Sequence, residues 1–309
     1  MNESACVILS HPNCAKHEMQ MGHPESPQRI LFIEKQLRQT AQDYCFDQAI
    51  ELGQIEDISL AHDKNYVDKI FAAAPSHGQT ILDADTSMNP WSLDAARRAV
   101  GAGIKAIDLL VTGQASHVFC NTRPPGHHAE HDRAMGFCIF NAIAIAAMKA
   151  LQQPSINKVA ILDFDVHHGN GTEDIVQGNQ AILFCSSFQH PFYPFSETSS
   201  SYSTIVKTPL AAETESAQFR QAIRDSWFPA IDQFQPDIIL VSAGFDAHMR
   251  DPLGGLALNE TDYFWLGQQV AALSSKYCQF GSLSMLEGGY QLEALAASVE
   301  SYIRGLNAK

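Results

Sequence analysis

The sequence predicts a single α/β domain, residues 1–309, in which helices cover both faces of a central, mostly parallel sheet. Three observations lead to this fold class. The chain of 309 residues is 45% hydrophobic, which is enough for one large core. Short apolar runs alternate with longer segments of helical periodicity, as in parallel sheets with crossover helices. We also find no linker, low-complexity tract or internal repeat that would divide the chain.

Six short apolar runs are predicted strands, and six longer segments are predicted helices. The predicted strands are residues 5–9, 117–120, 159–164, 181–185, 238–241 and 282–286. The predicted helices are residues 26–40, 92–110, 139–151, 215–234, 261–277 and 292–304. Pro27 suits a first helical turn, where the missing backbone N–H costs nothing. Gly305 is expected to end the last helix.

Composition and charge exclude several classes of protein. The net charge of -14 argues against nucleic-acid binding, which needs clustered Lys and Arg; it fits an acidic enzyme or the attraction of a cationic substrate. No apolar stretch approaches the roughly 20 residues that span a membrane. Residues 1–12 lack the basic segment of a secretory signal. Seven cysteines without a C-x-x-C pair favour the reducing cytoplasm over a disulfide framework.

Polar clusters follow five of the predicted strands at the points where the strands end. They comprise residues 123–128, 165–171, 186–187, 242–246 and 287–290. Ligands of open α/β sheets bind at the carboxyl ends of the strands. Five clusters from distant parts of the chain are therefore expected to meet at one edge of the sheet and form one composite site.

One metal ion is the expected centre of that site. Asp165 and His167 are two residues apart in an extended segment, so their side chains point the same way, and Asp246 follows another strand. Three O and N ligands with one open position are typical of catalytic zinc, although Fe²⁺ would also accept two carboxylates and one histidine. A lone D-x-D pattern more often caps a strand end, but here H-H-G and the other clusters accompany it.

His127, His128 and Tyr290 are the candidates for acid–base and oxyanion roles. The two histidines are adjacent, so they chelate poorly as a pair but can carry protons at neutral pH. Tyr290 follows two glycines, and its hydroxyl could polarise a carbonyl group. Taken singly, these residues would be read as solvated loop histidines and a packed tyrosine, and only their combination favours catalysis.

At this point the sequence resembles one family, the histone deacetylase and acetylpolyamine amidohydrolase superfamily, in a form similar to its class II and bacterial branches. The motifs occur in the family's order along nearly the whole chain, at residues 23–29, 123–129, 163–172, 242–255 and 287–290. The D-x-D-V-H-H-G-N-G motif is the most specific of them. The resemblance implies the arginase–deacetylase fold, which agrees with the fold class predicted above.

The resemblance also implies a role for each matched residue of the centre. It implies zinc ligation by Asp165, His167 and Asp246, a general base at His128, an electrostatic partner or acid at His127, and an oxyanion donor at Tyr290. Asp163 would orient His127 and, with Ser186, bind a structural K⁺ or Na⁺. Asn170 stands where some relatives have an aspartate partner for the second histidine.

A substrate tunnel is implied around this centre. Its predicted walls and rim are Gly136, Phe137, Tyr193, Leu253 and Asp85. Leu253 occupies the variable position of a D-P-x-G loop, where a polyamine-selective branch carries glutamate, so we expect acyl-lysine to be preferred. Glu130 is a second acidic candidate for the rim. Phe188 and the pair Phe195–Ser196 depart from the family pattern and put substrate fit in doubt more than chemistry.

The expected activity is hydrolysis of the N-acyl, mainly N-acetyl, amide of lysine side chains in peptides or proteins. An alternative substrate class is acetylated polyamines or other small N-acyl amines. Two other functions compete with this prediction: a degenerate module that binds acylated ligands without turnover, and a two-metal ureohydrolase. The first would lack ligands or the tyrosine, and the second needs further metal ligands. Acyl-chain length and oligomeric state stay open.

Overall fold

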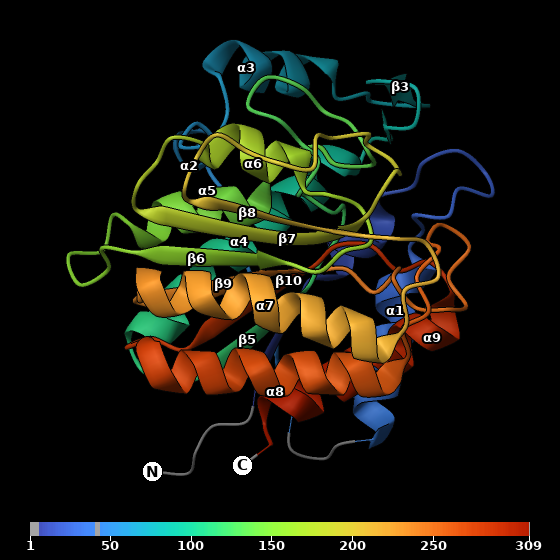
Figure 1. Ribbon diagram of the computed structural model, residues 1–309. Coiled ribbons are helices and arrows are strands. Elements are labelled where there is room, and N and C mark those ends of the chain that lie inside the picture. The colour runs from blue at the N-terminus through green and yellow to red at the C-terminus, as the bar shows by residue number, and fades with distance from the viewer. Residues whose placement is uncertain (1–5, 41–43, 309) are drawn as a thin grey trace.

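The fold is a wholly parallel eight-stranded sheet between two helical layers (Figure 1), in a computed structural model that describes residues 6–40 and 44–308. The strand order is β2-β1-β5-β10-β9-β6-β7-β8. These strands are β1 Val7–Ser10, β2 Cys45–Asp47, β5 His117–Asn121, β6 Val159–Asp163, β7 Ile182–Gln189, β8 Ile205–Leu210, β9 Ile238–Ala243 and β10 Ser282–Leu286. A separate antiparallel pair joins β3 Thr80–Ile81 to β4 Ser87–Met88.

Helices lie on both faces of the sheet (Figure 1). One layer contains α1 Gln28–Thr40, α7 Ser216–Phe234, α8 Glu260–Tyr277 and α9 Leu292–Leu306. The other contains α4 Ser92–Val111 and α5 Ala142–Ala150, with α2 Ile55–Ile58, α3 Lys64–Ala73 and α6 Asn170–Val176 beyond them. A short 3₁₀ helix, η1, spans Pro12–Lys16. The predicted fold class is therefore confirmed.

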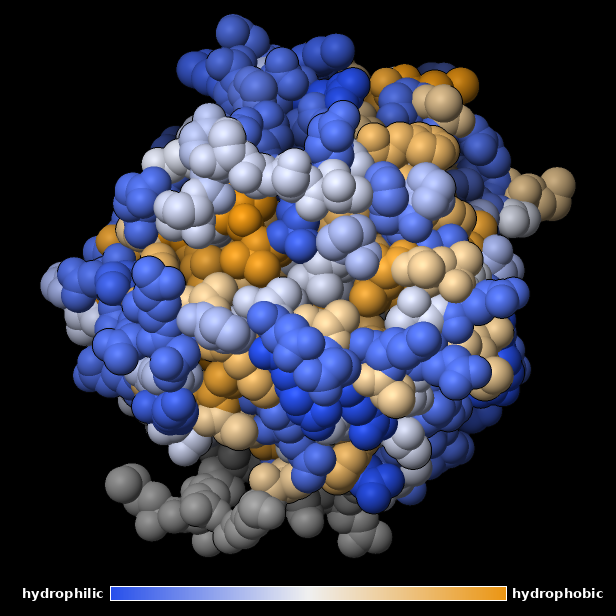
Figure 2. Space-filling model, in the orientation of Figure 1, coloured by the Kyte–Doolittle hydropathy of each residue, from blue (hydrophilic) through white to orange (hydrophobic). Residues whose placement is uncertain are grey.

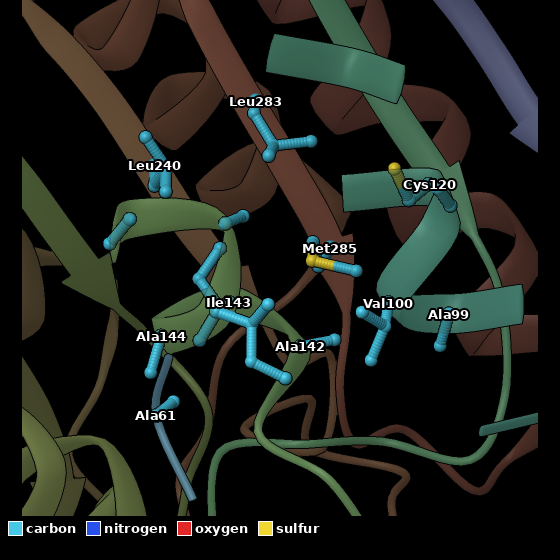
Figure 3. Packing of buried hydrophobic residues seen from close by; sticks show 14 of the residues in the cluster. Ala61, Ala99, Val100, Cys120, Ala142, Ile143, Ala144, Leu240, Leu283 and Met285 are labelled. Carbon is cyan, nitrogen blue, oxygen red and sulfur yellow. The ribbon is translucent and has the colours of Figure 1, made fainter. Parts of the chain in front are cut away.

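Each face of the sheet has its own hydrophobic core. On the α4–α5 side, Ile143 of α5 belongs to one core cluster with Leu240, Leu283 and Met285 of the central strands (Figure 3). The core on the other side is built around Phe164, Phe245 and Tyr302. Because both faces are covered, the central strands are buried along their whole length and mostly apolar, which is why the sequence shows apolar runs there.

All six predicted strands and all six predicted helices are present; the strand 282–286 has the predicted ends, and the other elements are shifted at one or both ends. Residue 5 lies outside the described residues. The predicted strand 181–185 runs on to Gln189, so Ser186 and Ser187 lie within β7 and do not follow it. The helix predicted from residue 139 begins at Ala142, because Asn141 caps it by accepting a hydrogen bond from the Ala144 nitrogen at 3.0 Å. The strands β2, β3, β4 and β8, the 3₁₀ helix η1 and the helices α2, α3 and α6 were not predicted.

The prediction that Gly305 ends the last helix is wrong. α9 continues through Gly305 to Leu306. A Cβ atom at residue 305 would lie 2.2 Å from the carbonyl oxygen of Phe264 and 3.0 Å from the Cα of Gly267. The glycine is therefore needed for the close approach of α8 and α9, and its position near the chain end concealed this role.

The surface is mainly hydrophilic on the face that Figure 2 shows. Figure 2 shows a face on which hydrophobic residues form separate patches between hydrophilic ones. Within the part of the chain that the structure describes, no helix is long and apolar enough to cross a membrane.

Candidate functional site

Two neighbouring strand ends bring Asp165, His167 and Asp246 together. β6 and β9 are paired, with Asp163 opposite Ser242, so the segments that follow them start side by side. The Nδ1 atom of His167 lies 3.0 Å from Asp165 Oδ1 and 3.2 Å from Asp246 Oδ2. One potential ligand atom from each of the three residues lies within 4.8 Å of the others. The two carboxylates are buried.

The electrostatics of this group favour a bound cation. Burial and the Asp165 carboxylate raise the pKa of Asp246 to about 7, and Asp246 Oδ2 is buried without a hydrogen-bond donor. Burial by itself lowers the pKa of His167, but its hydrogen bond to Asp165 and the nearby Asp246 carboxylate raise that pKa to about 10. A divalent cation would replace the proton and stabilise both carboxylates. Two carboxylate oxygens and one imidazole nitrogen fit Zn²⁺, so the donor set passes this chemical test.

Backbone contacts fix the two carboxylates. The Gly288 nitrogen donates to Asp165 Oδ2 at 2.8 Å, and the Val166 nitrogen donates to Asp246 Oδ1 at 2.8 Å. A Cβ atom at residue 288 would lie 2.0 Å from Asp246 Oδ2. Of the two glycines in the E-G-G-Y motif, only Gly288 lies against the two aspartates. A side chain at residue 288 would collide with them, so glycine is required there.

His127 and His128 lie beside this group and have opposite electrostatic surroundings. His127 Nδ1 is 3.0 Å from Asp163 Oδ2. Burial would lower the pKa of His127, but the carboxylates of Asp163, Asp165 and Glu287 raise it well above its ordinary value. Burial and the neighbouring His127 hold the pKa of His128 well below its ordinary value. Two adjacent groups whose pKa values are driven apart can act as an acid and a base.

His128 makes one side-chain hydrogen bond, through Nδ1 to Asn170 Oδ1 at 2.7 Å. Asn170 begins α6, directly after the D-V-H-H-G segment, which explains why its side chain reaches back to the histidine loop. The predicted partnership between Asn170 and the second histidine thus has the expected geometry, and its catalytic role stays a prediction.

A cavity of about 280 Å³ opens over these residues. Its walls include the predicted residues His127, His128, His167, Gly136, Phe137, Tyr193, Leu253, Asp85 and Tyr290. Phe137 meets Tyr290 edge to face at a centroid distance of 5.9 Å. Tyr193 meets the rings of His128 and His167 at 5.3 and 5.9 Å. An aromatic passage therefore leads to the Asp–His–Asp group.

The left-handed backbone of Gly136 and Phe137, with φ values of 56° and 69°, lets this segment turn over His128. The Phe137 nitrogen donates to the Thr86 hydroxyl at 3.0 Å, and that hydroxyl donates to Asp85 Oδ1 at 3.0 Å. Burial and the nearby Asp83 raise the pKa of Asp85. Asp85 is therefore linked through Thr86 to the tunnel wall.

Tyr290 is presented by a loop that is held from two sides. The Asp251 carboxylate accepts from the Tyr290 nitrogen at 2.6 Å and from the Leu253 nitrogen at 3.0 Å. The guanidinium of Arg29 donates to the Gly289 carbonyl at 2.6 Å and lies 4.9 Å from the centre of the Tyr290 ring. The loop that carries Leu253 is thereby joined to the loop that carries Tyr290.

Asp163 and Ser186, the predicted monovalent-cation residues, are opposite each other on β6 and β7. Both are buried. The Ser186 hydroxyl lies 2.9 Å from His168 Nδ1, and Phe188 packs against the same histidine at 4.7 Å. Their cation stays a prediction. Phe195, the other departure from the family pattern, is 78% exposed at the surface.

Several residues of the site were not predicted from the sequence. Phe192 stacks on His167 at 5.3 Å and lines the cavity, and Pro125, Pro252 and Gly288 also line it. Glu287 accepts from the nitrogens of Gly126 and His127 at 2.7 and 3.2 Å, and burial raises its pKa to about 7. Most of these residues lie inside the motifs that resemble the family, so the sequence indicated that they are near the site. It did not indicate which residues they contact. Glu130, a candidate for the rim, does not line the cavity and bonds Asn170 instead.

Comparisons with known proteins agree on one family. Residues 23–306 match the family described as "Histone deacetylase domain". An uncharacterized protein of Synechocystis sp. is 38% identical over 97% of this chain and 99% of its own length. An Archaeoglobus fulgidus protein named "Probable deacetylase" is 32% identical over 93% of this chain and 81% of its own. The crystal structure of the "HDA15 HD domain" has a TM-score of 0.90 and 30% identity, covering 98% of this chain and 88% of that one.

Proposed function

Since this chain belongs to the histone deacetylase family, we propose that it is a zinc-dependent deacylase that hydrolyses the N-acetyl amide of lysine side chains. The family supports deacetylase activity in general, and the metal and the substrate are our own proposals. One observation carries them: an Asp–His–Asp group lies beside two histidines of opposite pKa shift, and the three histidines line a cavity of about 280 Å³. We take the whole chain, residues 1–309, as the catalytic domain.

Asp165, His167 and Asp246 would hold the zinc ion. When bound, zinc supplies a Lewis acid for the acyl carbonyl group and lowers the pKa of water to near neutrality. Fe²⁺ would fit the same ligands. Asp163 and Ser186 would bind K⁺ or Na⁺, and this second cation would have only a structural role.

The side chains around the metal divide the proton transfers between them. His128 is neutral because its pKa is lowered, so it can accept the proton of the attacking water. His127 is protonated because its pKa is raised, so it can stabilise negative charge and give a proton to the departing amine. The hydroxyl of Tyr290 can donate a hydrogen bond to the developing oxyanion. The products are acetate and a free amine.

The residues that line the cavity favour an acyl-lysine substrate. Phe137, Tyr193 and Tyr290 give it aromatic walls that suit an aliphatic lysine chain, and Leu253 adds an apolar side chain to its lining. One observation favours the alternative, an acetylated polyamine or other small cationic amine: the Asp85 carboxylate also lines the cavity. We propose a cytoplasmic location, which the seven free cysteines support.

A substrate screen tests the proposal. Purified enzyme would be assayed on acetyl-, butyryl- and trifluoroacetyl-lysine peptides and on acetylated polyamines, before and after metal removal by a chelator. We expect acetyl-lysine hydrolysis, its loss on chelation, and recovery with Zn²⁺. Full activity after verified metal removal would refute the metal mechanism, and no hydrolysis of any acylated amine would refute the function. Faster turnover of acetylpolyamines would select the alternative substrate.

A further inference from the structure

The side-chain amide of Asn170 has a different partner on each side. Its Oδ1 atom lies 2.7 Å from His128 Nδ1. Its Nδ2 atom lies 2.8 Å from Glu130 Oε1 and 3.3 Å from the Met135 sulfur. The two ends of an asparagine amide have nearly the same shape but opposite hydrogen-bonding character, so their orientation must be fixed by their partners.

Glu130 provides that fixation. A carboxylate has only acceptors, and so it must face the NH₂ end of the Asn170 amide. The oxygen end is then directed to His128, and because this oxygen can only accept, His128 must carry its proton on Nδ1. Nε2 of a neutral His128 is left with its lone pair, and His128 lines the cavity. Glu130 thereby sets the tautomer of the proposed base, His128, although it contacts Asn170 and not the His128 ring.

His127 needs no such arrangement. Its partner is Asp163, and both oxygens of a carboxylate accept, so Asp163 accepts from His127 in either orientation. An asparagine at residue 170 creates an orientation problem that an aspartate there would not have. Glu130 is thus specifically required by the asparagine.

The position of Glu130 is itself well defined. Both of its carboxylate oxygens lie 2.8 Å from the Arg133 guanidinium. Its backbone nitrogen donates to the Arg133 carbonyl at 2.9 Å, and its carbonyl lies 2.9 Å from His62 Nδ1. Its side chain is 21% exposed and belongs to no wall of the cavity, which separates its action from direct contact with substrate.

We propose that Glu130 is a positioning residue that sets the amide orientation of Asn170 and thereby holds the proton of His128 on Nδ1, with Nε2 free to accept. The inference rests on the proposed function, because it assigns Glu130 to the base of that reaction. Loss of a partner in such an outer position lowers activity by about 10- to 100-fold in related arrangements around metal sites. We expect Glu130→Ala to lower kcat by at least about tenfold, with KM and zinc content little changed.

A double-mutant cycle distinguishes orientation from general structural support. The four proteins are the wild type, Glu130→Ala, Asn170→Asp and the double variant. In the asparagine background, removal of Glu130 frees the amide to flip, and kcat falls. In the aspartate background there is no amide to orient, and Glu130 would instead repel a second carboxylate. There, Glu130→Ala should leave kcat unchanged or raise it.

Two single variants and one spectrum complete the test. Glu130→Gln should give an intermediate loss of kcat, because a glutamine amide can present either its oxygen or its NH₂ group to Asn170 and so no longer fixes the orientation of the Asn170 amide. Arg133→Gln serves as the control, since it removes the outer ion pair and leaves the Asn170 contact in place. The ¹⁵N shifts of the histidine rings report the tautomer without any assay, and Glu130→Ala should reduce the Nδ1-protonated form of His128.

The outcomes separate the inference from the function. Equal losses of kcat in both backgrounds, or an unchanged His128 tautomer in Glu130→Ala, would overturn the positioning role. A wild-type protein inactive on every acylated amine would refute the proposed function, while the ¹⁵N spectra would still decide the role of Glu130.

Discussion

The floor and the rim of the cavity are held in place by different means. The floor, meaning Asp165, His167 and Asp246, is fixed by adjacent strand ends and by backbone nitrogens that bond both carboxylates. The rim, meaning Asp85, Leu253 and the 190–203 loop, stands on loops, with Leu253 half-buried and Phe195 78% exposed. Floor residues therefore have little freedom to vary, whereas rim residues can change without disturbing the sheet. The chemistry of this protein is specified more tightly than its choice of substrate.

The largest effect is expected on the floor. Asp246→Ala should abolish measurable deacylation and most zinc binding, because two protein ligands cannot hold the ion against solvent. Zinc content by mass spectrometry and activity on an acetyl-lysine peptide check this. Asp232→Ala, at an exposed carboxylate paired with Lys276, is the control and should behave like the wild type. Normal zinc content in Asp246→Ala would mean that the ligands are wrongly assigned.

The next largest effect is expected at Tyr290, in the wall of the cavity. Tyr290→Phe should lower kcat by about 10²–10³-fold, as expected for the loss of one oxyanion donor, with zinc content and KM nearly unchanged. The ring and its contact with Phe137 are kept, so only the hydroxyl is tested. Tyr277→Phe, whose hydroxyl bonds Asp232 at the surface, is the matched control. If Tyr290→Phe retained the wild-type kcat, another donor would have to stabilise the oxyanion.

The same contrast explains what the sequence could predict. The strand-then-cluster pattern was sufficient for the parallel sheet and for the assembly of Asp165, His167 and Asp246, because burial of parallel strands leaves a strong apolar signal that ends where the ligands begin. Strands β2 and β8 lie at the sheet edges, where exposure weakens that signal. Edge strands are therefore the elements that apolar patterning misses.

Contacts between loops were beyond sequence reasoning. Nothing in the local pattern indicates that Asp251 would bond the Tyr290 nitrogen, or that Glu130 would bond Asn170, because these pairs depend on how distant loops meet. Gly305 was wrongly read as a helix end for the same reason, since its function is set by α8. The sequence identifies the residues of the site more readily than the residues that position them.

The stability of the protein should fall in acid because of His62, which lies behind the metal-binding residues. His62 supports the histidine loop: its Nε2 accepts from the Asn141 nitrogen at 2.8 Å, so its Nδ1–H donates to the Glu130 carbonyl at 2.9 Å. This arrangement needs the neutral ring, and burial lowers the pKa of His62 from 6.5 to about 4. Between these pH values the unfolded chain binds a proton that the folded chain does not. The free energy of unfolding therefore falls as the pH drops from 6.5 to about 4.

His62→Gln measures this contribution. Glutamine can donate to the Glu130 carbonyl and accept from the Asn141 nitrogen without titrating. In urea unfolding at several pH values, the wild type should lose on the order of 3 kcal/mol more stability than His62→Gln over this interval. His77→Gln, at an exposed histidine, should follow the wild-type slope. Parallel slopes for the wild type and His62→Gln would show that His62 does not carry the acid sensitivity.

The smallest effect is expected at the rim, where one side chain is predicted to change selectivity and leave the chemistry intact. Leu253 lines the cavity, and its backbone nitrogen donates to Asp251, so a substitution of the side chain should leave the loop in place. In Leu253→Glu, a carboxylate would face the distant ammonium group of an acetylpolyamine. A partly buried ion pair contributes about 1 kcal/mol, which corresponds to about fivefold in kcat/KM for an acetylpolyamine relative to an acetyl-lysine peptide. Leu253→Gln, of the same size but uncharged, is the control and should not shift this ratio. If both variants shifted it equally, size and not charge would govern the mouth. A wild-type enzyme that already prefers acetylpolyamines by about tenfold would mean that Leu253 does not select the substrate and that Asp85 is the better candidate for binding the cation.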